Sequence, residues 1–257
     1  MAETTLTYGG YLKVPELLSL QVCLSSPLQH DEPLFIVIHQ VYELWFKLVL
    51  HEVDTAVRCL EEDKVAEGTR LLRRVVEIQR LLVHQVRVLE TMRPQDFLGF
   101  RYHLNPASGF QSVQFREVEF VLGLKDGGVI ERLRTSPEEK ARLERRLGAP
   151  SLGDALDALL ARRGFDRSGD EWRLRALLEV YEKPDAHADL NALAEVLIEI
   201  DECLSLWRAH HVQMVERMIG TKRGTGGSDG VAYLQSTLPK RAFPDLWRVR
   251  TRMGLEP

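Results

Sequence analysis

The feature that most constrains this chain is a run of mainly apolar residues between Leu190 and Ile219, spaced alternately three and four positions apart. The run consists of Leu190, Leu193, Leu197, Ile200, Leu204, Trp207, His211, Met214 and Met218. This spacing places all its members on one side of an α-helix and is typical of the packing seam of a helical bundle. It predicts a helix over residues 190–219, and Gly220 lies where a helix C-cap is expected.

A second long helix is predicted over residues 34–60, after the start signal Asp31-Glu32-Pro33. Its mainly apolar residues form two adjacent stripes: Leu34, Ile38, Val41, Trp45 and Leu48 in one, and Phe35, His39, Tyr42, Phe46, Val49 and Val53 in the other. The polar residues Gln40, Glu43, Lys47 and Asp54 lie on the opposite side. We therefore expect a long, deeply buried helix.

The rest of the chain is also predicted to be helical. Helices are expected over residues 65–92, where Pro94 ends the pattern, and over residues 112–122. Residues 125–185 are more polar and contain Gly and Pro, so they predict several short helices without recognisable chemistry. No segment shows the alternation of a strand. We predict one all-α domain over residues 1–257, a helical bundle with long core helices and little or no β structure, preceded by an N-terminal arm of about residues 1–14.

Charge and cysteine content narrow the function classes. The chain has 34 Lys and Arg against 38 Asp and Glu, a balance that disfavours a general nucleic-acid binder. Its three cysteines, Cys23, Cys59 and Cys203, are widely spaced, which favours a reducing cytoplasm over a disulfide scaffold. The N-terminus does not resemble a signal peptide, and the longest strongly apolar stretch, residues 33–42, is too short to span a bilayer. We expect a cytoplasmic protein without nucleic-acid or membrane partners.

Two histidines, His39 and His211, occupy apolar stripes of the two longest predicted helices. Either one alone is most simply a core histidine, but bundle interiors also hold metals and cofactors on inward side chains. The Glu-x-x-His motif of di-iron bundles and the His-Glu-x-x-His motif of zinc proteases are both missing. A site of two histidines and one carboxylate stays open, although no compact spacing supports it. One histidine beside a large apolar pocket fits haem, which needs only one strong protein ligand.

Three further features could belong to a binding site. Arg101 stands between two aromatic residues just before a Pro- and Gly-containing loop, and it is either a surface arginine or a clamp for a substrate carboxylate. The glycine-rich loop Gly224–Gly230 lacks the lysine of a phosphate-binding loop, so it is a connector or a segment that closes over a pocket. Tyr8 and Tyr11 belong to ordinary packing or to an arm that reaches a neighbouring subunit.

Read together, these segments resemble the tryptophan 2,3-dioxygenase family. The resemblance runs from residue 8 to about residue 235 in the family's order. It rests on these segments: Tyr8-Gly-Gly-Tyr11-Leu12, residues 30–47 from His30-Asp-Glu-Pro to Trp45-Phe-Lys47, Phe97-Leu-Gly-Phe-Arg101, residues 105–112 from Asn105-Pro-Ala-Ser108-Gly109 to Ser112, Trp207-Arg208 with His211, and Ile219-Gly220-Thr-Lys222-Arg223-Gly224-Thr225-Gly226-Gly227-Ser228. The helix around His39 and the glycine-rich loop are the most specific of these.

The resemblance implies an α-helical haem b enzyme, usually a homotetramer. It makes His211, rather than the adjacent His210, the iron ligand, and it places Ser108 and Gly109 against the haem. His39 is then the catalytic residue, a histidine on the distal side of the haem that accepts a hydrogen bond from the indole N–H. The same resemblance implies a substrate site formed by Phe35, Phe97, Leu104, Arg101 and Thr225, with Arg101 on the substrate carboxylate, and by Tyr8, Tyr11 and Leu12 of another subunit. Some relatives carry Tyr in place of Phe97.

The family resemblance gives the main functional hypothesis: opening of the indole ring of L-tryptophan with O2 to give N-formyl-L-kynurenine. One alternative is a haem monooxygenase that acts on a tryptophan-derived indole or oxindole. Some relatives keep the same motifs but insert a single oxygen atom into a tryptophan-derived compound. Another alternative is a non-catalytic haem or gas sensor. The sequence motifs do not separate these three hypotheses.

Overall fold

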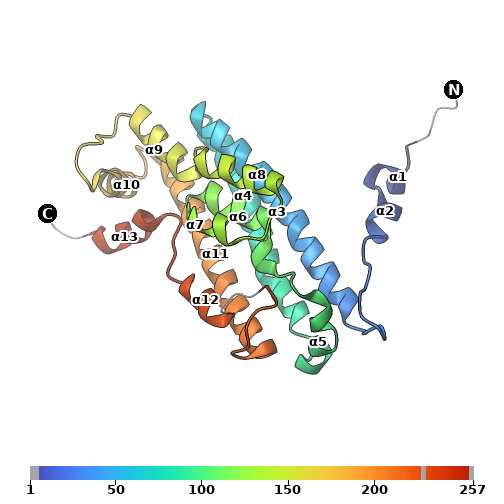
Figure 1. Cartoon of the computed structure of the whole chain (residues 1–257). Coiled ribbons are helices and arrows are strands. Elements are labelled where there is room, and N and C mark those ends of the chain that lie inside the picture. The colour runs from blue at the N-terminus through green and yellow to red at the C-terminus, as the bar shows by residue number, and fades with distance from the viewer. Residues whose placement is uncertain (1–5, 227–229, 255–257) are drawn as a thin grey trace.

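The computed structural model describes residues 6–226 and 230–254. Over these residues the chain forms helices joined by turns and loops, with no β-strand, which confirms the all-α prediction. The longest helices are α3 (Glu32–Glu61), α4 (Val65–Leu89) and α11 (Ala188–Ile219). Helix α4 packs along both α3 and α11, so the three helices form the body of the bundle (Figure 1).

Helix α11 forms as the apolar seam predicts. Leu193, Leu197 and Ile200 are completely buried, and the helix ends at Gly220 with a positive φ of 59°. Helix α4 ends at Leu89, three residues before the predicted end, and a turn then leads into Pro94. Helix α6 (Val113–Leu122) begins after Ser112, whose hydroxyl accepts a hydrogen bond from the backbone N–H of Phe115 at 3.1 Å.

Helix α3 is buried along only part of its length. Its C-terminal half lies in the main core, where Val53, Ala56 and Leu60 are fully buried. In its N-terminal half, Val37 and Leu44 are 43% and 52% exposed. The prediction that the whole helix is deeply buried is therefore wrong for this half, because one of its apolar sides has no covering element among the described residues.

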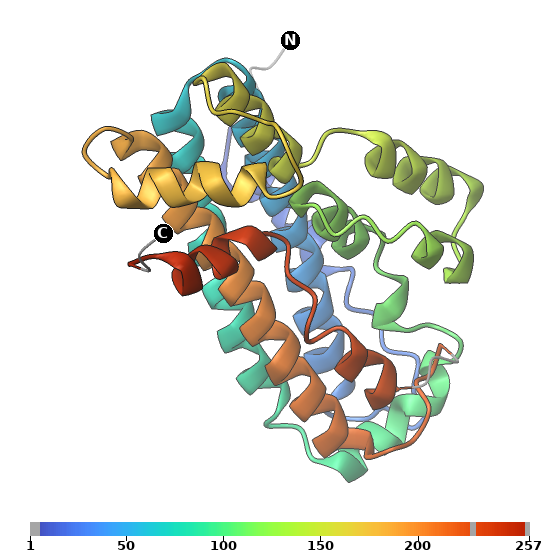
Figure 2. The same cartoon turned by 90° about the vertical axis from the view of Figure 1, so that its left-hand side faces the viewer.

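Shorter helices surround the three long ones. Between α4 and α6 lie α5 (Pro94–Arg101) and two 3-10 turns, η1 (Tyr102–Leu104) and η2 (Gly109–Gln111). The predicted short helices of the middle segment are α7 (Gly128–Arg132), α8 (Pro137–Gly148), α9 (Leu152–Arg162) and α10 (Trp172–Glu182). Helices α12 (Val231–Ser236) and α13 (Pro244–Arg252) complete the chain, and α13 packs against α10 and α11 (Figure 2). That all of this forms one domain stays a prediction.

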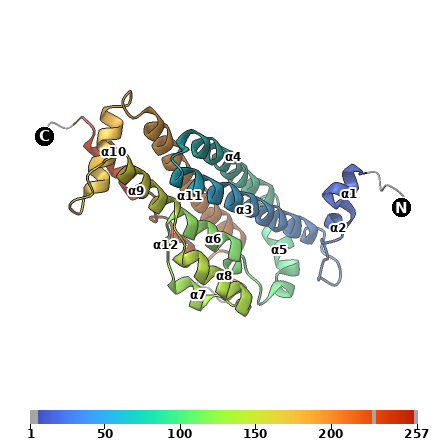
Figure 3. The ribbon, with the colours of Figure 1, turned by 90° about the horizontal axis from the view of Figure 1, so that it is seen from above.

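The N-terminal helices α1 (Tyr8–Leu12) and α2 (Val14–Leu18) stand apart from the bundle (Figures 1 and 3). The buried carboxylate of Glu32 fixes the segment after them, because it accepts hydrogen bonds from the backbone N–H groups of Leu24 at 2.6 Å and Ser25 at 3.0 Å. Residues 1–5 of the predicted arm lie outside the described residues.

One helix of the described chain, α3, is long and apolar enough to cross a bilayer by length and composition alone. The apolar stretch of residues 33–42 is therefore part of a longer apolar segment. In the structure, α3 contacts α4, α6 and α9, as the core helix of a bundle does.

Candidate functional site

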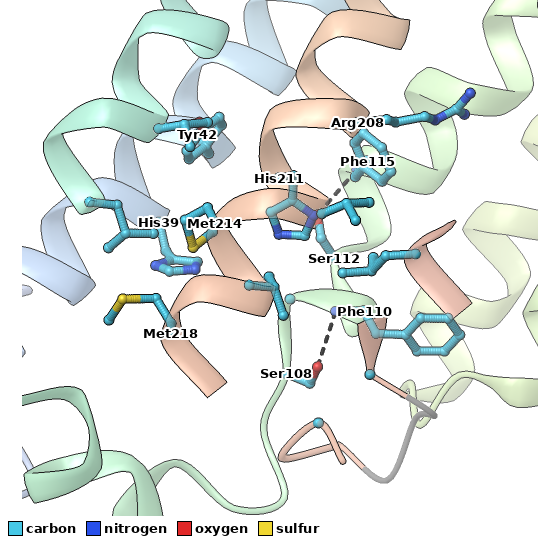
Figure 4. Close-up of a pocket in the computed structure, with 18 of the residues that line it drawn as sticks. His39, Tyr42, Ser108, Phe110, Ser112, Phe115, Arg208, His211, Met214 and Met218 are labelled. Atoms are coloured by element: carbon cyan, nitrogen blue, oxygen red, sulfur yellow. Dashed lines mark hydrogen bonds between the residues drawn. The ribbon is translucent and has the colours of Figure 1, made fainter. Parts of the chain in front are cut away.

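A cavity of about 270 Å³ lies where α3 and α11 face each other, with further walls from α4, α5, α6, α12 and two loops (Figure 4). Most of its lining is apolar or aromatic, as in most small-molecule and cofactor sites. The apolar side chains that line it are Phe35, Phe46, Val86, Leu89, Met92, Phe97, Phe110, Phe115, Trp207, Val212, Met214, Val215, Met218, Ile219 and Leu234.

Both predicted histidines line this cavity. His39 enters it from α3 and His211 from α11 (Figure 4). The neighbouring His210 is not among the lining residues, since the register of α11 turns it away. The two helical stripes therefore bring His39 and His211 to the same cavity.

The surroundings of His39 set its tautomer. Its Nδ1 lies 2.7 Å from the backbone oxygen of Phe35, which can only accept, so Nδ1 carries the hydrogen and Nε2 is left as an acceptor. Burial lowers the pKa of His39, although the bond to Phe35 and the charge of Glu43 act in the other direction. The ring is consequently a neutral hydrogen-bond acceptor near pH 7.

His211 is a neutral imidazole with both ring nitrogens available. Burial, and next the nearby His39, lower its pKa to about 4. Its ring stacks on the indole of Trp207, with centroids 5.0 Å apart and planes 7° apart. Among the described residues, no side chain or backbone group makes a hydrogen bond to it. A neutral imidazole in this state is a suitable ligand for a transition metal.

No group of three or more His, Cys, Asp or Glu side chains is arranged to hold a metal ion within residues 6–226 and 230–254. The alternative of two histidines plus one carboxylate, which the sequence left open, thus finds no support in this part of the chain. A metal held through a single histidine, as in a haem protein, remains compatible with the cavity.

The loop that follows α11 packs closely against the loop before α6. The Thr225 hydroxyl donates a hydrogen bond to the backbone oxygen of Ala107 at 2.6 Å, and Arg101 Nη2 donates to the backbone oxygen of Arg223. At Gly226, a Cβ atom would lie only 2.6 Å from the Cβ of Ser108, so only glycine fits. Up to Gly226, this loop is a packed wall of the cavity; Gly227, Ser228 and Asp229 lie outside the described residues.

The structure brings together most of the predicted substrate and cofactor residues. Phe35, Phe97, Arg101, Ser108, Gly109 and Thr225 line the cavity with the two histidines. Leu104 packs against the same apolar cluster as Phe35 and Phe97 but does not line the cavity. Tyr8, Tyr11 and Leu12 are exposed and do not line the cavity of their own chain.

A buried cluster of charged side chains that was not predicted from the sequence lies at the cavity and is formed by Arg116, Glu119 and Arg208. Glu119 accepts hydrogen bonds from Arg116 at 2.6 Å and from Arg208 at 2.8 Å, and all three side chains line the cavity. Within the part of the chain that the structure describes, the buried Nε of Arg116 has no hydrogen-bond partner. Two guanidinium groups against one carboxylate leave excess positive charge at this wall. The available signal was the placement of Arg116 and Glu119 in a short helix, residues 113–122, in which six of the ten residues are apolar.

Glu43 was predicted on the polar side of its helix, but it lines the cavity. Its carboxylate accepts hydrogen bonds from the Ser112 hydroxyl at 2.6 Å and from Gln114 Nε2 at 2.8 Å. The prediction was wrong because α6 packs against this side of α3, so the helix has neighbours on more than its apolar face. Glu43 thereby joins the helix of His39 to the segment that follows Ser108.

Comparison with known proteins agrees with this arrangement. A family model described as tryptophan 2,3-dioxygenase matches residues 1–135 and 154–253. A protein named tryptophan 2,3-dioxygenase from a Nocardioides species is 51% identical over 96% of this chain and 95% of its own. Proteins of the same name from Xanthomonas oryzae pv. oryzae and Bacillus thuringiensis are each 42% identical, over 99% and 98% of this chain and 90% and 94% of their own. The chain therefore belongs to the tryptophan 2,3-dioxygenase family.

Proposed function

We propose that this protein is a haem-dependent dioxygenase that opens the indole ring of L-tryptophan with O2 to give N-formyl-L-kynurenine. The observation that carries the proposal is that His39 and His211 face one apolar cavity. The proposal is supported by relatives named tryptophan 2,3-dioxygenase that match this chain over nearly its whole length.

The residues present fit a haem group. His211 offers a neutral imidazole that no described residue engages in a hydrogen bond, and the apolar walls suit a porphyrin ring. The unpartnered Nε of Arg116 and the excess positive charge it shares with Arg208 suit a propionate carboxylate. In our proposal His211 would hold the iron, Arg116 and Arg208 would hold a propionate, and Ser108 and Gly109 would lie at the edge of the group. Haem, when bound, supplies the activation of O2.

The chain's own residues would bind and orient the substrate. His39 Nε2 would accept a hydrogen bond from the indole N–H, because its Nδ1 is already engaged with Phe35. The aromatic walls Phe35 and Phe97, whose ring centroids lie 5.8 Å apart, would pack against the indole. Holding the substrate in one orientation beside the reacting group lowers the entropic part of the barrier.

The amino-acid end of the substrate would be bound by Arg101 and Thr225. The Nε of Arg101 is buried and has no hydrogen-bond partner among the described residues, so a substrate carboxylate would satisfy it. The Thr225 hydroxyl donates its hydrogen to Ala107 and keeps lone pairs that can accept from an ammonium group. The closely packed loops around both residues would exclude water from the cavity.

We also propose a homotetramer in which Tyr8, Tyr11 and Leu12 complete the pocket of a neighbouring subunit. Tyr8 is 79% and Tyr11 71% exposed in the single chain, and Val37 and Leu44 leave an uncovered apolar face on α3. Exposed apolar groups of this extent favour burial between subunits.

The function is tested with purified full-length protein reconstituted with haem. L-Tryptophan is added anaerobically to the ferrous protein, 18O2 follows, and the product mass is determined. Two labelled atoms in the product support the proposal. One labelled atom indicates the monooxygenase alternative, and haem binding without any product indicates a sensor. His211→Ala should abolish the haem Soret band, whereas the matched control His210→Ala should keep it.

A further inference from the structure

The imidazole of His211 lies in an aromatic assembly that spans three helices. Trp207, one helical turn earlier on α11, stacks on it with nearly parallel planes. Trp207 also contacts Phe115 of α6, with ring centroids 5.0 Å apart, and Tyr42 of α3, edge to face at 6.2 Å. The indole is thus packed on several sides while it presents its face to the histidine.

A chain of hydrogen bonds holds the indole in place. Its Nε1–H donates to the hydroxyl of Tyr42 over a long 3.4 Å, and that hydroxyl donates to the backbone oxygen of Leu82 at 2.7 Å. Burial raises the pKa of Tyr42 to about 12, so the hydroxyl keeps its hydrogen at any ordinary pH. The position of Trp207 on α11 is therefore set by α3 and α4.

This arrangement matters because the described protein groups give His211 no hydrogen-bond partner that would orient its ring. A metal-ligating histidine generally donates its second ring N–H to a carboxylate, carbonyl or water, which fixes the ring plane. Among the residues the structure describes, no carboxylate or carbonyl accepts a hydrogen bond from His211. The stacked indole is the contact that restricts rotation of its ring.

We propose that Trp207 is a positioning residue that fixes the plane of the His211 imidazole by ring stacking, with Tyr42 as its anchor. The inference rests on the proposed function, in which His211 holds the haem iron. Stacking orients the imidazole without a hydrogen bond to either of its nitrogens. It would therefore set the plane of the His211 ring and leave the basicity of this ligand largely unchanged.

The test compares Trp207→Leu, Trp207→Phe and Tyr42→Phe with Trp172→Leu. Trp172 is a half-buried tryptophan of α10 that does not line the cavity, so it controls for the general effect of losing an indole. The first measurement uses apoprotein with 13C-labelled histidine, in which the stacked indole shifts the His211 ring signals upfield. We expect this shift to disappear in Trp207→Leu, to persist in part in Trp207→Phe, and to be unchanged in Trp172→Leu.

The second measurement uses the haem-loaded protein. The interaction free energy of a stacked aromatic pair corresponds to a factor of about 2 to 12 in rate, so Trp207→Leu should lose haem faster by this factor. Trp207→Phe and Tyr42→Phe should show a smaller increase in the dissociation rate. The iron–imidazole stretching band in the resonance Raman spectrum should broaden in Trp207→Leu. Wild-type ring shifts and a wild-type dissociation rate in Trp207→Leu would overturn the inference. Failure of the wild-type protein to bind haem would instead overturn the proposed function and the role of Trp207 toward iron, while the apoprotein shifts would still report the stacking.

Discussion

Gly226→Ala should disturb the cavity wall without unfolding the protein. The added Cβ would lie 2.6 Å from the Cβ of Ser108, whereas carbon atoms in contact prefer roughly 3.5–4.0 Å. The loop must therefore move by about 1 Å, away from a backbone-attached atom that cannot rotate aside. Overpacking of this kind costs about 1–3 kcal/mol.

That displacement should weaken substrate binding, because the neighbouring residue Thr225 belongs to the proposed substrate site. Thr225 precedes Gly226 and is held by its 2.6 Å hydrogen bond to Ala107. If the strain is relieved by moving this loop alone, kcat/KM for L-tryptophan should fall by about 5- to 150-fold, the factor that corresponds to 1–3 kcal/mol. The melting temperature should fall by only about 2–4 °C for each kcal/mol of strain, since the main core lies elsewhere and stays intact.

The assay is steady-state formation of formylkynurenine, together with thermal unfolding of the same samples. Gly148→Ala is the matched control, because a Cβ at Gly148 meets nothing within 4 Å. We expect the control to keep wild-type kcat/KM. A Gly226→Ala protein that is folded and within twofold of wild type would refute the close packing of the two loops.

Three further predictions follow from buried polar groups. Arg101→Ala should raise KM for L-tryptophan by about 10- to 100-fold through loss of a charge-assisted hydrogen bond; an unchanged KM would remove Arg101 from the substrate site. Glu119→Ala should lower the free energy of unfolding by about 3–5 kcal/mol in denaturant titration, since it leaves two buried guanidinium groups without their carboxylate. Loss of the exposed Glu67, which pairs with Arg70, should leave the free energy of unfolding nearly unchanged. The pKa of Glu32 is lowered in the folded protein because hydrogen bonds from Leu24 and Ser25 outweigh burial, which raises it. Its stabilisation is therefore complete above the ordinary carboxyl pKa of 4.5 and is lost as pH falls through the lower folded value. Glu32→Gln should accordingly be less stable than wild type near pH 7, with a difference that shrinks below pH 4.5; a difference that stays constant down to pH 3 would contradict this assignment.

Local periodicity predicted the long helices well, and it also predicted that His39 and His211 lie on the apolar faces of two of them. The seam from Leu190 to Met218 defines one face of α11, and the same rule places His39 on an apolar stripe of α3. Both depend on the fixed pitch of an α-helix, which backbone geometry sets for every sequence, so the spacing of residues along the chain is enough to assign them to a face. The shared cavity follows once the two helices pack against the same neighbour.

Features that depend on distant segments could not be predicted in this way. Glu43 has a polar position in helix periodicity, yet it faces the cavity because α6 supplies Ser112 and Gln114 as partners. The pairing of Glu119 with Arg208 joins residues 89 positions apart. The need for glycine at 226 arises only from the approach of Ser108. Each of these is a contact between elements, and single-sequence patterns carry no information on which elements meet.

The position of α4 has a consequence for how enzymes of this architecture can diverge. This helix packs along both histidine-bearing helices, and Val86 and Leu89 on it reach the cavity. It therefore acts as a spacer, since the bulk of its inward side chains helps to determine how far apart the two imidazoles stand. Exchanging Val86 or Leu89 for a smaller or larger residue would resize the chamber while His39 and His211 stay on their own helices, so α4 offers a route to accept bulkier or slimmer molecules without altering the reacting groups.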